Sequence, residues 1–194
     1  MERAPFTLPI RMVCRLALWR KRPPSYHRPN GCMRINNREN GMFDIERIRN
    51  SWQREAAAID ALVSTINPAT AAEPVRSDGW TTHDLVGHIA NSARGFVQFV
   101  QGRTVEQFDI DMFNEQQRER GRRRAWEDVQ QYWARVRDEV VAFLATADRS
   151  IGDQPVALPH LPQLKTAGEA LRILIVHTRS HRQELEQGFP PVQA

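Results

Sequence analysis

The chain has 194 residues, a formal net charge of +4 at pH 7 and two cysteines, and these totals already narrow the class of protein. A chain of this length can bury a hydrophobic core without disulfide support, which predicts one domain with a tail. Residues 1–41 hold nine Arg or Lys against two Glu, a local charge of +7, so the remaining chain carries −3. The overall basicity therefore gives little support to a nucleic-acid-binding domain, and we expect no nucleic-acid partner.

Residues 1–41 form a basic segment that we expect to be disordered, because Arg, Pro, Asn and Gly follow one another there without an apolar period. One alternative is an arm for nucleic acid or anionic lipid. Another is that translation starts downstream, at Met33 or Met42. Arg11 and Arg15 interrupt the one apolar stretch of this segment, which is therefore neither a signal-peptide core nor a membrane span.

Both cysteines, Cys14 and Cys32, lie in this basic segment. The domain that we predict over residues 42–190 therefore has no disulfide, no thiol nucleophile and no thiolate ligand of its own. That composition suits a reducing compartment. Together with the missing export signal, it predicts a cytoplasmic protein without a membrane partner.

Four segments downstream of residue 42 have the apolar spacing of amphipathic helices, at steps of three and four residues. Their apolar stripes begin and end, in chain order, at Ile45 and Ile66, Leu85 and Phe99, Trp126 and Leu144, and Leu171 and Leu185. Trp52, Trp126 and Trp133 fall on these stripes, so we expect them to pack in the core. Because no single helix can bury its stripe alone, the sequence predicts an all-α fold, a four-helix bundle.

Capping boxes mark the start of two of these helices. In each, a threonine is followed three positions later by an acidic residue, Thr81 by Asp84 and Thr166 by Glu169. Each side chain can then bond the backbone N–H of the other residue, which satisfies two amide groups that the helix leaves unpaired. The spacing therefore predicts helices that begin after Thr81 and Thr166.

Two connections between the predicted helices are long, residues 103–124 and 149–165. Simple up-and-down bundles use short loops, so at least one of these connections is expected to cross the length of the bundle. The first ends in an arginine-rich stretch, residues 118–124, which we interpret as a solvated loop. The alternative is a docking site for the carboxylates of an acidic thiol or substrate, reached if this loop folds over the mouth of the bundle.

Three of the six histidines fall on faces that two helices can bring together. His177 and His181 are four residues apart, so both imidazoles project from one face of the last helix and suit two sites on one metal ion. His88 lies on the apolar stripe of the second helix, where an unpaired ring would cost about 1–3 kcal/mol. We predict one divalent metal ion on all three. The alternative is a hydrogen-bonded core histidine at 88 and a solvated pair on the last helix.

The other ionisable residues near these positions have weaker assignments. His83 lies about 140° around the helix from His88 and is expected to be exposed. His160 is interpreted as a solvated loop residue, with closure over the site as the alternative. Glu184 and Asp84 each lie one helical turn from a predicted ligand and are candidate catalytic residues that orient an imidazole or move a proton. The alternative for both is an ordinary capping or surface carboxylate.

Two motifs carry a resemblance to a known family over residues 42–188. The first is Gly-Trp-Thr-Thr-His-Asp-Leu-Val-Gly-His at residues 79–88, and the second is His-Thr-Arg-Ser-His-Arg at residues 177–182. Together they resemble the DinB-like metal-binding bundle superfamily, in which a Trp precedes the second helix, that helix supplies one His, and the last helix supplies an H-x-x-x-H-R pair. The matching residues are Trp80, His88, His177, His181 and Arg182.

The resemblance implies a metal-dependent function and the class of reaction. Three imidazoles leave a Zn²⁺ or Ni²⁺ ion with an open position, and related families include mycothiol-dependent maleylpyruvate isomerases and bacillithiol transferases. We therefore expect a divalent metal cofactor, a low-molecular-weight thiol of the mycothiol type as cosubstrate, and transfer or isomerisation of a small electrophile. A metal-dependent hydrolase and a non-catalytic, stress-associated binding bundle remain alternatives, and a homodimer is compatible with this kind of bundle.

Overall fold

The computed structural model describes residues 43–104 and 109–188, so the predictions for residues 1–41 lie outside the described chain. The described ranges contain no strand, and none of their helices is long and apolar enough to cross a membrane. The elements, in chain order, are α1 (Ile45–Thr65), α2 (Pro68–Ala71), α3 (Thr82–Val100), α4 (Ile110–Arg122), α5 (Trp126–Thr146), the 3-10 helix η2 (Arg149–Asp153) and α6 (Ala167–Gly188). The prediction of an all-α fold is confirmed.

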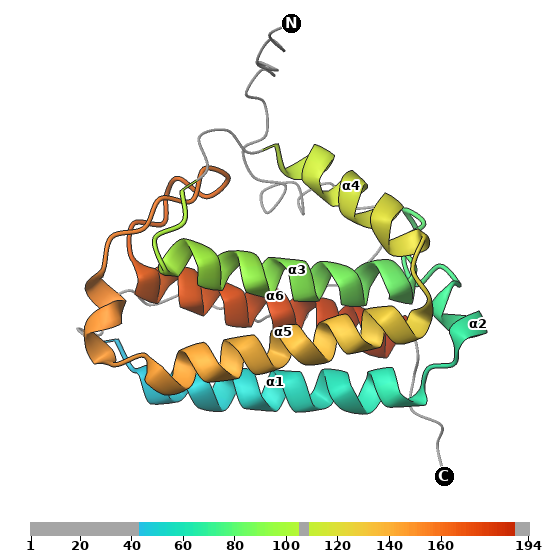
Figure 1. The fold of residues 1–194 in the computed structure, drawn as a ribbon, viewed down its shortest axis with the longest axis horizontal. Coiled ribbons are helices and arrows are strands. Elements are labelled where there is room, and N and C mark those ends of the chain that lie inside the picture. The colour runs from blue at the N-terminus through green and yellow to red at the C-terminus, as the bar shows by residue number, and fades with distance from the viewer. Residues whose placement is uncertain (1–42, 105–108, 189–194) are drawn as a thin grey trace, which may run out of the picture.

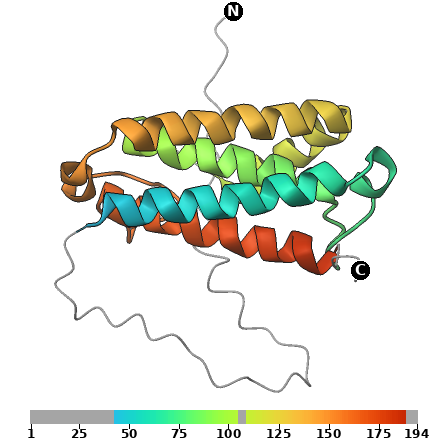
Figure 2. The ribbon, with the colours of Figure 1, turned by 90° about the horizontal axis from the view of Figure 1, so that it is seen from below.

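Helices α1, α3, α5 and α6 form a four-helix bundle (Figure 1). Helix α1 packs between α5 and α6, as Figure 2 shows, and α3 packs against the same two helices from the other side. Helices α1 and α6 run in one direction and α3 and α5 in the other (Figure 1). Helices α3 and α5 are therefore parallel neighbours, and the chain returns along the length of the bundle between them. The prediction of a long crossing connection is confirmed for the segment that contains α4.

The predicted apolar stripes form the core of this bundle. Trp52 of α1 and Trp133 of α5 are almost completely buried, and their ring centroids lie 6.1 Å apart. Each indole N–H of α5 has an acceptor on α1 or at its C-terminal end: Trp133 donates to Asp60 Oδ1 at 2.7 Å, and Trp126 donates to the carbonyl of Ile66, the residue after α1, at 3.0 Å. Full burial of a large apolar side chain contributes about 1.5–3 kcal/mol. The tryptophans pack in the core, as expected.

Both predicted capping boxes are present. At the start of α3, the Asp84 amide donates to Thr81 Oγ1 and the Thr81 amide donates to Asp84 Oδ2, both at 3.1 Å. At the start of α6, the Glu169 amide donates to Thr166 Oγ1 at 3.3 Å and the Thr166 amide donates to Glu169 Oε2 at 3.1 Å. These caps define where the two helices that carry the histidines begin.

Helix α4 corrects the sequence analysis, which predicted a loop from residue 103 to residue 124. The arginine-rich stretch is helical as far as Arg122, and Asp109 caps the helix by accepting from the amides of Asp111 and Met112 at 3.0 Å each. Glu, Gln and Arg favour helices, but α4 buries no residue completely and so has no apolar stripe to detect. It lies on the outside of the bundle, over α3 (Figure 1).

Candidate metal centre

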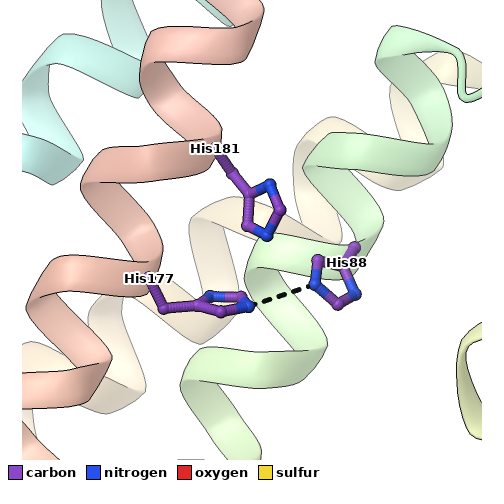
Figure 3. A group of neighbouring side chains, drawn as sticks. All are labelled: His88, His177 and His181. Atoms are coloured by element: carbon purple, nitrogen blue, oxygen red, sulfur yellow. Dashed lines mark hydrogen bonds between the residues drawn. The ribbon is translucent and has the colours of Figure 1, made fainter. Parts of the chain in front are cut away.

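The bundle brings the three predicted histidines together, because α3 and α6 are antiparallel neighbours. His88 projects from α3 toward His177 and His181 on α6 (Figure 3). The Nε2 atoms of His88 and His177 are 3.2 Å apart. The ring centroid of His181 lies 4.9 Å from that of His88 and 4.5 Å from that of His177. One possible ligand atom from each residue lies within 4.8 Å of the other two, so the group could hold a metal ion.

The donor set fits a divalent metal ion. Metal–nitrogen bonds of about 2.0–2.1 Å place two ligands of a tetrahedral zinc ion about 3.3 Å apart, close to the 3.2 Å between the Nε2 atoms of His88 and His177. Two facing imidazole nitrogens with both lone pairs turned inward repel each other unless a proton or a cation lies between them. The Nδ1 atoms of both rings are buried without a hydrogen-bond partner. The pair therefore offers two neutral donors to a shared cation.

Burial keeps these imidazoles neutral. Burial lowers the pKa of His88 well below its usual value, and the charges of the neighbouring histidines and of Arg76 lower it further. Burial also lowers the pKa of His177 to about 3, with smaller contributions from His181 and His160. A neutral imidazole has the free lone pair that a metal ligand needs. Both rings are thus in their ligand form at neutral pH.

Glu184 lies beside the third ligand. Its Oε2 accepts a hydrogen bond from His181 Nδ1 at 3.0 Å and pairs with Arg76 Nη1 at 3.3 Å. A proton on Nδ1 leaves the lone pair on Nε2, so the carboxylate selects the tautomer that can bind metal. Burial alone would raise the pKa of Glu184, but the His181 hydrogen bond and charge, with Arg76, hold it below its usual value. This placement supports the orienting role predicted for Glu184.

Asp84, the other carboxylate singled out from the sequence, lies in a different environment. Its side chain is completely buried, and its Oδ2 accepts from the Thr81 amide and from Arg122 Nη2, the latter at 3.4 Å. Arg118 Nε lies 3.7 Å from the same oxygen. These contacts cap α3 and connect it to α4, and none of them joins the carboxylate to a histidine ring. The capping alternative therefore describes Asp84 better than a role at the metal.

Two other histidines differ from expectation. His83 was expected to be exposed but is buried, because the connection between α4 and α5 covers that side of α3. Its Nε2 lies 3.1 Å from the carbonyl of Arg124, and its ring lies 6.0 Å from that of Trp126. His160 was interpreted as a solvated loop residue. Instead its ring lies 6.0 Å from that of Phe99 at the wall of the site, and burial lowers its pKa.

A pocket of about 1100 Å³ opens over the three histidines, between α3, α4 and α6. His88, His177 and His181 all contribute to its wall. The wall near α6 is partly apolar, with Ile173 and Val176, and the α4 side is mixed, with Ile110 and Phe113 beside polar residues such as Asn114 and Arg118. The volume is typical of a small-molecule site, so a ligand can reach the histidines from solvent.

An ion pair that lies behind the histidines was not predicted from the sequence. Glu55 of α1 is buried, and its carboxylate accepts from Arg179 Nε at 2.7 Å and from Arg182 Nε at 2.8 Å. These contacts fix α6, which carries two of the three candidate ligands, against α1. Glu55 lies between Trp52 and Ile59 on the apolar stripe of α1. A charged residue at such a position indicates a buried ion pair, because a buried charge needs a partner.

A four-helix bundle in which three histidines converge below an open pocket has the features of a metal-binding helical bundle. The sequence profile of the DinB superfamily matches residues 44–185, a range that includes all three histidines. The chain therefore belongs to the DinB superfamily, which confirms the resemblance read from the two motifs. Comparisons with curated proteins and with solved structures find no match for this chain.

Proposed function

We propose that the protein binds one divalent metal ion, Zn²⁺ or Ni²⁺, through His88, His177 and His181 and uses it in a thiol-dependent transfer or isomerisation of a small electrophile. The observation that carries this proposal is the donor set, three converging imidazoles at the wall of an open pocket. Three neutral protein ligands that leave a position for an exchangeable group are typical of catalytic metal sites.

A low-molecular-weight thiol of the mycothiol type is the proposed cosubstrate. When bound, a divalent ion lowers the pKa of a coordinated thiol and thereby supplies a thiolate at neutral pH. No cysteine lies in the described ranges, and the proposed source of the reactive sulfur is the cosubstrate. A cytoplasmic location, where such thiols are kept reduced, agrees with this chemistry.

The carboxylate of Glu184 is already engaged with two neighbours. It accepts from His181 and pairs with Arg76, and its pKa is lowered. A divalent ion would lower the pKa of a bound thiol or of a bound water, so neither reaction requires this carboxylate as a base. The proposed role of Glu184 is therefore to position His181 rather than to activate water.

Metal content, measured by mass spectrometry on untagged protein, tests the proposal. Near one equivalent is expected in the wild type and in His27→Ala, which removes a histidine from the N-terminal segment, and much less in His181→Ala. Absence of metal from all three folded proteins, with no binding of added zinc or nickel, would contradict the proposal. With metal bound, consumption of thiol in the presence of monobromobimane, above the rate of His181→Ala, supports catalysis. Binding without consumption would identify the non-catalytic alternative.

A further inference from the structure

Several polar side chains of α4 have buried atoms without hydrogen-bond partners. Four of its side-chain atoms are buried without a hydrogen-bond partner: Asn114 Oδ1, both polar atoms of the Gln117 amide and Arg118 Nε. Asn114 and Arg118 are one helical turn apart, so they lie on one face of α4, and both line the pocket over the histidines. Buried polar groups normally have partners. The Nε of Arg118, which lacks a hydrogen-bond partner, is a donor that an anion can satisfy, whereas Asn114 can meet an anion through its Nδ2 group and not through its unpaired Oδ1.

Arg118 lies close to the histidine centre. Its guanidinium carbon lies 5.3 Å from the ring centroid of Trp80, and that ring lies 5.2 Å from the imidazole of His88. The indole thus connects the guanidinium to the candidate metal ligand through two successive ring contacts. Arg118 and His88 also line the same pocket.

The local charge balance leaves Arg118 available for an anion. Two guanidinium groups, those of Arg118 and Arg122, share the single buried carboxylate of Asp84, so the second positive charge is balanced only by the exposed Glu115. Glu115 also pairs with Arg118 at 3.1 Å, but it is 56% exposed. Ion pairs with such an exposed partner are weak, so the carboxylate of a ligand in the pocket can replace it.

The other arginines of the pocket are already engaged. Arg76 pairs with Asp78 at 2.7 Å and with Glu184 at 3.3 Å. Arg94 pairs with Glu139 at 3.1 Å. Arg103 donates to the side-chain amide of Gln98. Arg118 is paired too, with Asp84 and Glu115. Among the pocket arginines, however, it combines the lowest side-chain exposure, 17%, with a contact to the Trp80 ring beside His88.

We propose that Arg118 and Asn114 form a carboxylate-binding subsite, which selects small molecules that carry a carboxylate near the atom that reaches the histidine centre. The inference rests on the proposed function and deepens it by naming the substrate class. A guanidinium binds a carboxylate through two parallel N–H···O bonds, and the Asn114 amide can donate a third. No bond is made or broken at this subsite, which positions the ligand.

Titration with propionate, which has a carboxylate and no thiol, tests the subsite without relying on the metal. The Trp80 indole N–H signal in nuclear magnetic resonance spectra is expected to shift in wild type and in the control Arg120→Gln, which removes an exposed charge from the same helix. Arg118→Gln should weaken propionate binding at least about tenfold, because it removes a charge-assisted hydrogen bond. Equal affinity in Arg118→Gln and wild type would overturn the proposal.

A second variant and a second ligand pair complete the test. Asn114→Leu removes the second residue of the subsite and leaves the ion pairs of Arg118 in place. Weaker propionate binding in this variant would therefore show that the loss of binding in Arg118→Gln does not come from a folding defect. In cobalt-loaded protein, the absorption spectrum is expected to report tighter binding of 3-mercaptopropionate than of 2-mercaptoethanol, a preference that Arg118→Gln abolishes. If cobalt does not bind, the proposed metal function is wrong, and the propionate titration still tests the subsite by itself. If the two thiols bind with equal affinity and propionate binding depends on Arg118, the subsite binds a carboxylate of the electrophile and not one of the thiol.

Discussion

The two walls of the pocket, one formed by α3 and α6 and the other by α4, are held in place by different interactions. The α3 and α6 wall belongs to the bundle, where buried apolar side chains surround the histidines and the buried Glu55 fixes α6 from behind. The α4 wall buries no residue completely, and two of its arginines pair with one carboxylate of α3, that of Asp84. The candidate metal ligands are thus on the tightly packed part of the molecule, and the proposed recognition residues are on the less tightly packed part.

This difference has a functional consequence. Ligands for a metal ion must be held within fractions of an ångström, which packed helices can do. A recognition surface tolerates more variation, since α4 can change its polar residues without opening a cavity in the core. We therefore expect substitutions on the two walls to affect different properties: metal affinity and stability on one, ligand preference and local exchange on the other.

The largest expected effect follows from His88→Leu. Loss of one of three ligands should reduce metal affinity by more than about 100-fold. The same change removes a buried Nδ1 that has no partner, so the metal-free protein should keep or raise its melting temperature. Isothermal titration with zinc and thermal unfolding in a chelator measure the two effects. A parallel loss of stability without metal would show that His88 is a structural residue instead.

Glu55→Gln should have the next largest effect, this time on the bundle. The change removes the buried carboxylate that Arg179 and Arg182 share, and leaves Arg182 only the more exposed Glu186. The free energy of unfolding should therefore fall by about 2–4 kcal/mol. Glu46→Gln is the matched control, because its pair with Arg49 is exposed and contributes less than about 1 kcal/mol. Denaturant unfolding of metal-free protein compares them, and equal losses would refute the anchoring role.

Glu184→Gln tests the orientation of His181. The variant lacks the carboxylate that accepts from His181 Nδ1, and loss of such a partner lowers metal affinity by about 10–100-fold. Glu186→Gln, on the same helix, should leave the affinity unchanged. Competition with a zinc chelator provides the measurement. An unchanged affinity in Glu184→Gln would leave this carboxylate with a role only in its pair with Arg76.

The pH dependence of stability should report the buried imidazoles. The pKa of His177 is lowered to about 3 in the folded protein, so below pH 6.5 the unfolded chain binds a proton that the folded protein does not. Stability is therefore complete above pH 6.5 and falls with pH by up to about 1.4 kcal/mol per unit until the folded pKa is reached. His177→Phe should flatten this slope between pH 6.5 and 4.5 in denaturant unfolding with a chelator. An unchanged slope would contradict the lowered pKa of His177.

The smallest effect is expected on the other wall, from Arg122→Gln. Arg122 is about half exposed and lies 3.4 Å from the Asp84 carboxylate, so its removal should destabilise only the attachment of α4, by about 1 kcal/mol or less. Hydrogen exchange of the α4 amides should become several-fold faster while exchange in α1 and α5 stays the same. Faster exchange throughout the bundle would mean that α4 is an integral part of the core.

The sequence by itself determined the bundle helices and the candidate ligands. Apolar spacing is a local property, and it identified the four stripes, the buried tryptophans and the capping boxes at Thr81 and Thr166. The four-residue spacing of His177 and His181 and the position of His88 on a stripe likewise indicated where the imidazoles point, and the family motifs supported this interpretation.

The tertiary structure alone decided what covers each helix. Helix α4 has no apolar stripe, so periodicity could not reveal it, and its polar face acquires a role only where it meets the pocket. His83 is buried because the chain near Arg124 passes over it. Glu55 pairs with Arg182, which is far away in the sequence. Local spacing says which face of a helix is buried, but which residues meet across that face depends on how the whole chain packs.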